Sequence, residues 1–465
     1  MSMANLTPNP SFSLSIRIEL PNYIGILATV TSSIASNGGN LGPIDLIEQT
    51  RETSIRDIIV NASSSEHAET IVQGLRALPH IKVLNVYDRT FNLHKGGKIS
   101  IANCMPLNDV SELAMAYTPG VGRVCSAIAK QPEKVYEFTI KQNMVAIITD
   151  GSAVLGLGNL GPAAALPVME GKAMLFKEFA GINAFPICIE SQDTDEIVNT
   201  IKNIATVFGG VNLEDIAAPR CFEIEAKLQQ ELDIPVFHDD QHGTAIVTLA
   251  ALLNALKLVR KSIEKVRIVI NGAGSAGIAV ARLLRKAGSK NICICDSQGI
   301  ISINRTNLTP EKQEFAIKAC GVLAESVKGA DVFIGLSAPG VLNPEMVKSM
   351  AKDPIVFAMA NPIPEIQPEL IYDDVAVIAT GRSDYPNQIN NVIAFPGVFR
   401  GVLDCRATTI NSNMYLEAAN AIASLIEPSN LNKENIIVSV FDKRVVTAVS
   451  DAVQKVAREE GIACC

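Results

Sequence analysis

The sequence lacks the features that mark nucleic-acid or membrane-surface binding. Its 40 basic residues are outnumbered by 48 acidic ones, and lysine and arginine gather in no run or pole. Proteins that bind nucleic acids or anionic membranes usually carry such a basic patch. We therefore expect no nucleic acid and no membrane among the partners of this chain, which has a formal net charge of −8.

Disulfide frameworks, signal peptides and membrane spans are also missing. The ten cysteines form no CxxC pair, and the first residues, "MSMANLTPNPSF", have neither the basic nor the apolar region of a signal peptide. The longest apolar run, "GTAIVTLAALLNALKLV", is interrupted by Asn254 and is shorter than a membrane span. We expect a soluble, cytoplasmic protein, in which Cys293 and Cys295 are buried strand residues.

The chain is long enough for several domains. With 465 residues, of which 48% are hydrophobic and 19% charged, it has the composition of a globular protein. Because single cores stop growing near roughly 250 residues, this length predicts about two to four domains.

The first 90 residues predict a small domain. The segment "SLSIRIEL" alternates apolar and polar residues, which is typical of a half-buried strand. Apolar periodicity then indicates a helix after Pro21, strands at "IDLIEQ" and "SIRDIIVNA", a helix at "SEHAETIVQGLRAL" and a strand at "IKVLNVYD". The order βαββαβ is ferredoxin-like. It resembles the ACT domain, which commonly binds amino acids, here near the loop Asn37 to Gly42; a dimerisation module is the alternative.

Beyond a connector at 91–108 the chain predicts an α/β fold. Continuous apolar runs alternate with helical stretches, which indicates parallel strands buried on both faces. The first series holds "MVAIITD", "AFPICIES" and "IPVFHDD". The second holds "KVRIVINGAG", "NICICD", "DVFIGLS", "PIVFAMANP" and "VAVIATG", and helices follow to the C-terminus.

Two segments match the G-x-G-x-x-G pattern of a dinucleotide-binding turn, "LGLGNLG" at 155–161 and "NGAGSAG" at 271–277. Such a site needs a strand that leads into the turn, a helix that starts in it, and an acidic residue at the end of the next strand. Only the second match meets all three. We assign the cofactor to it, with these residues: Gly272, Gly274, Ser275, Ala276, Gly277 and Asp296. A tight turn without ligand is the alternative.

Asp296 bears on the choice of cofactor. A carboxylate there accepts hydrogen bonds from the ribose hydroxyls and repels a 2′-phosphate, which favours NAD over NADP. The adjacent Ser297 leaves NADP possible, because a small polar residue can accommodate a phosphate.

Reactive side chains gather before the second glycine motif. "NLEDIAAP" holds Glu214 and Asp215, "VFHDDQHGTA" holds Asp239 and Asp240, and "VMEGKAMLFKEF" holds Lys172. Carboxylates at strand ends are suited to bind Mg²⁺ or Mn²⁺. Taken singly, a helix N-terminus and a turn would also explain these acidic pairs.

Together these segments resemble the malic enzyme family, in its short prokaryotic form. The matching segments, in the family's order, are "AYTPGV", "LGLGNLG", "EGKAMLF", "NLEDI", "FHDDQHGTA", "NGAGSAG", "MANPIPE" and "NNVIAFPG". The resemblance implies three parts: an added ACT-like regulatory domain at 12–90, a catalytic domain at 91–242, and a Rossmann-type NAD(P)-binding domain with C-terminal helices at 243–465.

The resemblance also implies roles for single residues. Lys172 is the base for the C2 hydroxyl of malate, with a pKa lowered by burial near cations, and Asp239 orients it. Tyr117 is the acid that protonates C3. The metal ligands are Glu214, Asp215 and Asp240. The substrate-binding residues are Asn361, Asn390 and Asn391, of which Asn361 also serves the cofactor. A solvated lysine, a core tyrosine and turn asparagines are the alternatives.

One departure concerns the substrate. Larger members of the family clamp malate with an arginine just before the first glycine motif, where this chain reads "DGSAVLGLGNLG". Ser152 and Ala153 cannot replace the bidentate recognition that an arginine gives. Backbone amides of "LGLGNLG" are one possible replacement.

The predicted activity is metal-dependent oxidative decarboxylation of L-malate to pyruvate and CO₂ with reduction of NAD(P)⁺. A malolactic enzyme, which returns the hydride to make lactate, is the nearest alternative. An amino-acid dehydrogenase and a non-enzymatic sensor built on the ACT-like domain are further ones. The resemblance also implies a homo-oligomer, a dimer or a tetramer, and the added domain implies a small-molecule effector.

Overall fold

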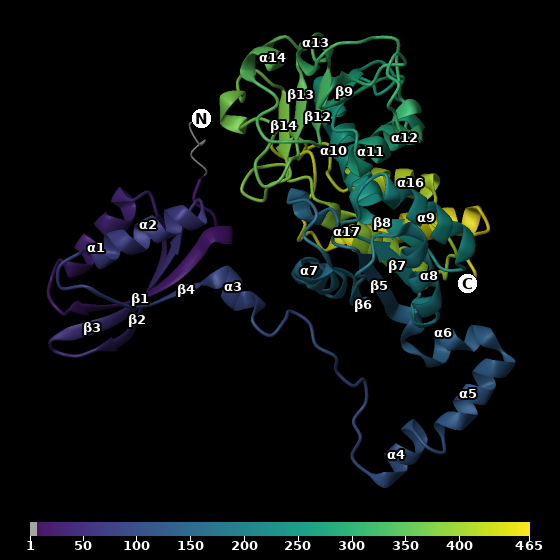
Figure 1. Ribbon diagram of the computed structural model, residues 1–465, viewed down its shortest axis with the longest axis horizontal. Helices are drawn as coiled ribbons and strands as arrows, with labels where there is room; N and C mark the ends of the chain where they lie inside the picture. The colour runs from purple at the N-terminus through teal and green to yellow at the C-terminus, as the bar shows by residue number, and fades with distance from the viewer. Residues whose placement is uncertain (1–6) are drawn as a thin grey trace. The chain divides into compact units, whose positions relative to one another are not determined.

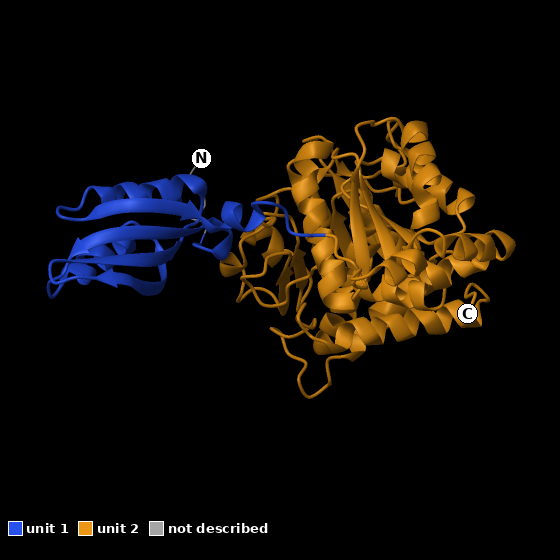
Figure 2. Cartoon of the chain, turned by 90° about the horizontal axis from the view of Figure 1, so that it is seen from below, with its two compact units in different colours: residues 1–100 blue, residues 101–465 orange. Residues whose placement is uncertain are grey.

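The computed structural model describes residues 7–465, which divide into two compact units at Ser100 and Ile101 (Figure 2). The N-terminal unit contains its six elements in the order read from the sequence, βαββαβ. They are β1 (Ser13–Pro21), α1 (Ile26–Ser36), β2 (Asn40–Gln49), β3 (Thr53–Asn61), α2 (Ser65–Arg76) and β4 (Lys82–Asp88). The strands form one antiparallel sheet in the order β2-β3-β1-β4.

Alternation along β1 builds the core of this unit. Leu14, Ile16, Ile18 and Leu20 are all buried, and they pack with the apolar faces of α1 and α2 on one side of the sheet (Figure 1). Ser64 caps α2 by accepting a hydrogen bond from the backbone of His67. Strand β2 begins at Asn40, so the loop expected to run to Gly42 ends three residues earlier, at Gly39.

The second unit contains two parallel sheets. The first has the order β6-β5-β7-β8. Its elements are β5 (Met144–Thr149), α7 (Pro162–Ala180), β6 (Asn183–Cys188), α8 (Thr194–Ile204), β7 (Gly210–Leu213), α9 (Arg220–Glu231) and β8 (Val236–His238). Strand β7 was not predicted, because four residues are too short for an apolar run to stand out, although all four are buried.

The other sheet has the order β11-β10-β9-β12-β13-β14. Its strands are β9 (Arg267–Asn271), β10 (Asn291–Asp296), β11 (Gly299–Ile300), β12 (Val332–Gly335), β13 (Ile355–Ala358) and β14 (Val377–Thr380), with helices α11 (Ser275–Lys286), α12 (Pro310–Gln313), α13 (Leu323–Ser326) and α14 (Pro344–Lys348). All neighbours are parallel except β11, a short antiparallel addition to β10 that was not predicted. Cys293 and Cys295 are buried in β10, as expected.

Three helices near the C-terminus cover the first sheet's side of the unit. They are α15 (Phe395–Asp404), α16 (Ser412–Ser424) and α17 (Arg444–Glu459). Helix α15 packs against α7, α17 against α15, and α16 against α17 and α10 (Thr244–Val259). The ring of Phe176 on α7 lies 4.7 Å from that of Phe395 and 5.2 Å from that of Phe399, measured between centroids. The chain thus returns from the second sheet to cover the first.

One helix is long and apolar enough to cross a membrane by length and composition alone, because the apolar run noted in the sequence continues from the turn before it. It joins the π-helical turn η6 (Asp239–Gly243) to α10 (Thr244–Val259) and spans 21 residues. Of its most apolar stretch, 67% is buried inside the protein. A central core helix has this composition for the same reason that a membrane helix does, because it is surrounded by apolar groups.

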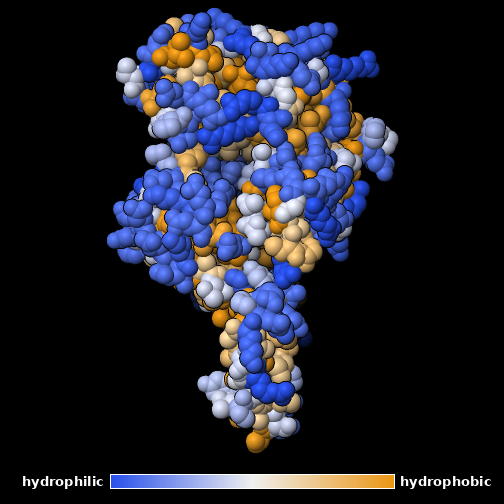
Figure 3. Space-filling view, turned by 90° about the vertical axis from the view of Figure 1, so that its right-hand side faces the viewer, coloured by the Kyte–Doolittle hydropathy of each residue, from blue (hydrophilic) through white to orange (hydrophobic). Residues whose placement is uncertain are grey.

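The segment after residue 100 forms an arm. Helices α4 (Val110–Ala116), α5 (Val121–Lys130) and α6 (Val135–Phe138) extend away from the two sheets (Figure 1). Large apolar side chains along it are exposed, among them Ile101, Met105, Leu107, Val110 and Met115. Figure 3 shows apolar side chains on this protruding part of the molecule.

Short elements complete the chain. They are α3 (Arg89–His94), η1 (Pro10–Phe12), η2 (Pro132–Lys134), η3 (Ile140–Asn143), η4 (Val154–Gly156), η5 (Ala205–Val207), η7 (Pro368–Leu370) and η8 (Asn391–Ile393).

Candidate active site

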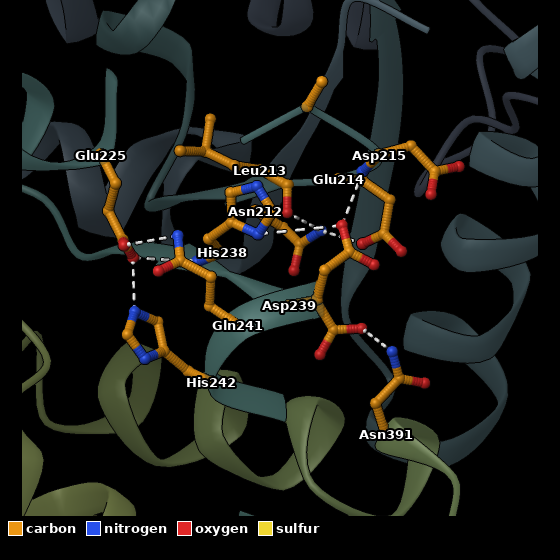
Figure 4. A network of polar contacts seen from close by, with 12 residues as sticks. Asn212, Leu213, Glu214, Asp215, Glu225, His238, Asp239, Gln241, His242 and Asn391 are labelled. Carbon is orange, nitrogen blue, oxygen red and sulfur yellow. Dashed lines mark hydrogen bonds and ion pairs between the residues drawn. The ribbon is translucent and has the colours of Figure 1, made fainter. Parts of the chain in front are cut away.

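The carboxyl ends of β7 and β8 bring four acidic side chains together. Figure 4 labels three of them, Glu214, Asp215 and Asp239. Glu214 and Asp215 follow β7, and Asp239 and Asp240 follow β8, the parallel neighbour of β7. Because parallel strands end at the same edge of a sheet, the two pairs meet there. The turn after β8 is π-helical, a form often found at functional sites.

Lys172 reaches this cluster from α7. Its Nζ lies 3.0 Å from Glu214 Oε1, donates a hydrogen bond to Asp239 Oδ2, and stands 4.2 Å from the centre of the Phe395 ring. Asn391 Nδ2 donates to the same Asp239 oxygen at 2.5 Å. The structure therefore places Asp239 against Lys172, the contact that the resemblance implied, whereas Asn391, expected to contact substrate, donates to Asp239.

The pKa expected for Lys172 is corrected by the structure. Burial alone would lower the pKa of the lysine, but attraction by Asp239 and Glu214 outweighs it, and the pKa is raised above its usual value. The sequence interpretation assumed nearby cations, whereas the side chain faces two carboxylates. Lys172 is held as an ammonium ion in this arrangement.

The three predicted metal ligands lie close enough to share one ion. Glu214, Asp215 and Asp240 each offer one carboxylate oxygen within 4.8 Å of the others. Burial raises the pKa of Asp215 to about 8 and that of Asp240 to about 6, and repulsion between the acidic groups adds to both. Asp215 Oδ2 is buried and has no hydrogen-bond partner among the described residues. Oxygen donors with unmet charge fit a hard divalent cation.

A second set of polar contacts supports the turn after β8. Glu225 on α9 accepts hydrogen bonds from the His238 backbone at 3.1 Å, from Gln241 Nε2 at 3.1 Å and from His242 Nε2 at 2.8 Å. Attraction by His242 holds the pKa of Glu225 below its usual value despite burial, whereas burial lowers the pKa of His238 to about 4.

Glu225 was missed in the sequence, although a signal for it exists. It shares the spacing of the buried residues of α9, Cys221, Ile224 and Leu228. A glutamate on the apolar face of a helix needs a partner, since an unpaired buried charge is costly.

The first glycine motif lies beside this cluster. The Leu155 amide points to Asp215 Oδ1 at 3.4 Å, and the Ala153 amide donates to the Asp215 carbonyl at 3.0 Å. A Cβ on Gly156 would lie 3.3 Å from the Asn361 carbonyl oxygen. This turn therefore lines the same edge of the sheet as the acidic residues.

Three other predicted site residues make no hydrogen bond to Lys172 or to the acidic cluster among the described residues. Asn361 is exposed, and Asn390 caps η8 by accepting a hydrogen bond from the Val392 amide at 3.0 Å. Tyr117 ends α4 on the arm and is 68% exposed. The hydrogen bonds of Tyr117 among the described residues are backbone ones to Leu113 and Val121, on the arm itself.

The second glycine motif has the close approaches of a dinucleotide-binding turn. Gly272 has φ +125°, and a Cβ there would lie 2.3 Å from the Leu336 carbonyl oxygen. A Cβ on Gly277 would lie 1.8 Å from the Gly272 carbonyl oxygen, so the helix packs tightly on the turn. Gly274 faces open space and leaves room for a pyrophosphate at the start of α11, where Ser275 and Ala276 present their amides.

Asp296 stands at the end of β10, as predicted, but it is not free. Its carboxylate accepts two hydrogen bonds from Arg305, at 2.8 and 2.9 Å, and one from Lys312 Nζ at 2.9 Å. These contacts outweigh burial and hold the pKa of Asp296 well below its usual value. The sequence interpretation missed both cations, which lie after the strand and outside the motif.

A dinucleotide-binding sheet beside a buried cluster of one lysine and four carboxylates defines an oxidoreductase of the dinucleotide-dependent class. The comparisons narrow this class. Family models match residues 96–229 as "Malic enzyme, N-terminal domain" and residues 241–458 as "Malic enzyme, NAD binding domain". The chain belongs to the malic enzyme family.

Similar proteins and solved structures that are named as malic enzymes support this assignment. The NAD-dependent malic enzyme of Geobacillus stearothermophilus is 53% identical over 97% of this chain and 96% of its own. The bifunctional malic/malolactic enzyme of Bacillus subtilis is 53% identical over 82% of this chain and 95% of its own. The crystal structure of malic enzyme from Pyrococcus horikoshii has a TM-score of 0.78 at 46% identity and covers 81% of this chain and 91% of that one.

Proposed function

We propose that this chain catalyses the metal-dependent oxidative decarboxylation of L-malate to pyruvate and CO₂ with reduction of NAD(P)⁺. The observation that carries the proposal is the buried contact of Lys172 with Glu214 and Asp239 at the edge of the sheet that also holds Asp215 and Asp240. Relatives named as NAD-dependent and as NADP-dependent malic enzymes support it. The catalytic domain is 91–242, and the dinucleotide domain is 243–465.

Glu214, Asp215 and Asp240 would hold Mg²⁺ or Mn²⁺. When bound, such an ion supplies a Lewis acid that binds substrate oxygens and withdraws charge from a carbonyl. Asn361, Asn390 and Asn391 would contact malate, and amides of the turn 155–161 take the place of the missing arginine.

Lys172 acts as the base toward the C2 hydroxyl of malate, and Asp239 and Asn391 orient it. Asp239 and Glu214 hold the pKa of Lys172 above its usual value, so within this set of side chains the proton stays on the lysine. With a divalent cation held by Glu214, Asp215 and Asp240, carboxylate charge would be neutralised and the ammonium group repelled, which would favour the free amine that general-base chemistry needs. Because the side chains of Lys172 and Asp239 are almost fully buried, water is kept from competing for the proton.

Tyr117 acts as the acid toward C3 from a second copy of the chain. The arm that carries it exposes apolar side chains that no described element of its own chain covers, and exposed apolar patches of this kind mark protein–protein interfaces. A homo-oligomer would bury the arm and bring Tyr117 to a lysine site.

The arm assignment is tested by mixing two inactive variants. Tyr117→Phe and Lys172→Ala homo-oligomers should each lose activity by about 10²-fold or more. Joint refolding should restore activity, because a mixed oligomer contains one site with both groups intact. Absence of recovery in mixed oligomers, with subunit exchange verified by tagged chains, would place the tyrosine elsewhere.

A malolactic activity is the second candidate. One observation favours it, namely the similarity to the bifunctional malic/malolactic enzyme of Bacillus subtilis.

An assay with malate, Mn²⁺ and NAD⁺ separates the two candidates. For oxidative decarboxylation the absorbance of NADH should rise, EDTA should abolish the increase, and excess Mn²⁺ should restore it. Lactate without net NADH would support the malolactic reaction instead.

Residues 12–90 form an ACT-like regulatory domain that binds a small molecule near Asn37 to Gly39. Its βαββαβ order and antiparallel sheet support this assignment. A screen of amino acids should find one that binds and changes the rate of NADH formation. If no amino acid binds or changes the rate, the domain has a packing role only.

A further inference from the structure

We propose that Arg305 and Lys312, through their ion pairs with Asp296, set the choice between NAD and NADP in this chain. The proposal rests on the dinucleotide site of the proposed function and names the residues that read the 2′ position of its ribose. Neither cation belongs to the glycine motif, so the motif and Asp296 alone do not determine the preference.

Asp296 lies directly beside the glycine turn. Its neighbour Cys295 is the register partner of Asn271, and the Gly272 amide donates to the Cys295 carbonyl at 2.9 Å. The adenosine ribose of a dinucleotide bound at this turn contacts the acidic residue at the end of the second strand. The carboxylate of Asp296 therefore stands where the 2′ substituent of the ribose would come.

Four donors already engage this carboxylate. Arg305 donates through Nη1 to Oδ1 and through Nη2 to Oδ2, Lys312 donates to Oδ2, and the Gln298 amide donates to Oδ1 at 3.0 Å. The two cations come from different segments, because Arg305 lies in the loop after β11 and Lys312 lies on α12. The fold thus directs two separate positive groups to one point.

The charge at this point is positive. One carboxylate faces two cations, and the exposed fractions of the three side chains are 11% for Asp296, 16% for Arg305 and 26% for Lys312. The net charge of the three side chains therefore does not repel a 2′-phosphate, although Asp296 still occupies the two cations that would bind it. Arg305 Nε is also buried without a hydrogen-bond partner among the described residues, so the guanidinium has one N–H donor that Asp296 does not use.

Asp296 and a 2′-phosphate thus compete for the same two cations. A phosphate monoester carries about −1.5 to −2 charge at neutral pH and accepts hydrogen bonds from guanidinium and ammonium groups. With Asp296 in place, the carboxylate occupies both cations and holds NADP affinity down. With the carboxylate removed, both cations are free to bind the phosphate.

The test measures binding alone. ADP-ribose and 2′-phospho-ADP-ribose are titrated calorimetrically into the full-length protein without malate or metal, so turnover plays no part. Asp296→Asn should tighten binding of the 2′-phosphate form, relative to ADP-ribose, by about tenfold to a hundredfold. Arg305→Gln should lower the affinity for 2′-phospho-ADP-ribose, relative to that for ADP-ribose, by about tenfold or more. The affinity for ADP-ribose itself should be nearly unchanged.

Asp331→Asn is the matched control. Asp331 also pairs with a lysine, Lys261, at 2.8 Å, but it precedes β12 and so lies at the opposite edge of the same sheet. The ratio of its affinities for 2′-phospho-ADP-ribose and ADP-ribose should equal that of the wild type.

If Asp296→Asn does not fold, the ratio measured for Arg305→Gln alone tests the proposal.

Two outcomes overturn the proposal and differ from each other. If the wild type binds ADP-ribose and the affinity ratio is the same in all variants, the two cations do not set the preference, and the dinucleotide site stands. If the wild type binds neither ligand, the dinucleotide site of the proposed function is itself wrong, and this inference falls with it.

Discussion

Two charged clusters of the second unit have opposite imbalances. At the ends of β7 and β8, four carboxylates face one lysine, and nearly all of these groups are buried. At the end of β10, one carboxylate faces an arginine and a lysine, and the three side chains are partly exposed. The first cluster is short of positive charge and the second is short of negative charge.

The difference teaches what each cluster is built to bind. A buried charge is tolerated when it is paired, so an unmatched group in a cleft predicts a ligand of the opposite sign. The imbalance at Glu214, Asp215 and Asp240 fits a divalent cation, and that at Arg305 and Lys312 fits an anionic group of a cofactor. The variants of Asp296 and Arg305 described above test the second cluster, and three further predictions test the first.

Lys172→Ala should have the largest effect. Loss of the base should lower kcat by about 10²- to 10⁴-fold, measured as NADH formation with saturating malate and Mn²⁺. Lys177→Ala is the matched control, because Lys177 lies on the same helix but is exposed, with Asn183 as its partner. Equal losses in both variants would show damage to the helix and not loss of a catalytic group.

Asp240→Asn should have the next largest effect, on metal affinity. Removal of one charged ligand should weaken Mn²⁺ binding by at least about a hundredfold, the upper end of what loss of an outer-shell partner costs. Titration calorimetry with Mn²⁺ measures this directly. Asp233→Asn, at an exposed aspartate just before β8, should bind Mn²⁺ like the wild type. Unchanged affinity in Asp240→Asn would remove Asp240 from the ligand set.

Asn391→Ala should have the smallest effect of the three. It removes one hydrogen bond to Asp239 and leaves Lys172 in place, so kcat should fall by about tenfold. Because Asn391 orients the base, Asn391→Asp should move the pH profile of kcat, whereas a packing role would not move it. The pH profiles of the two variants and the wild type decide between these roles.

The sequence predicted one acidic pair from a strand and the other from the family resemblance. Asp239 and Asp240 come after the apolar run of β8. Glu214 and Asp215, by contrast, follow β7, which was not predicted, and were identified by their motif "NLEDI". The resemblance implied Asp239 as a partner of Lys172, but not Glu214, and it assumed nearby cations, so the predicted pKa was lowered where two carboxylates raise it. Arg305 and Lys312 were missed because one lies in a loop and the other in the four-residue helix α12, and neither segment carries a periodic signal.

Tyr117 illustrates a different limit. The resemblance implied a catalytic tyrosine, but Tyr117 is exposed on the arm, away from Lys172. Periodicity within one chain does not predict contacts with a second copy, so the sequence did not predict this position. Strand β7 was lost for the simpler reason that it is only four residues long. Alternation along β1 and the long apolar faces of α1 and α2 made the N-terminal unit the easiest part to predict.

The stoichiometry of products tests the central claim most directly, namely that the acidic cluster and the dinucleotide site serve one reaction. The full-length protein is given L-malate, Mn²⁺ and excess NAD⁺, and pyruvate, lactate and NADH are measured together over time. We predict that pyruvate and NADH appear in equal amounts and that lactate stays at background. No turnover of malate in the presence of Mn²⁺, or lactate formed without net NADH, would contradict the account.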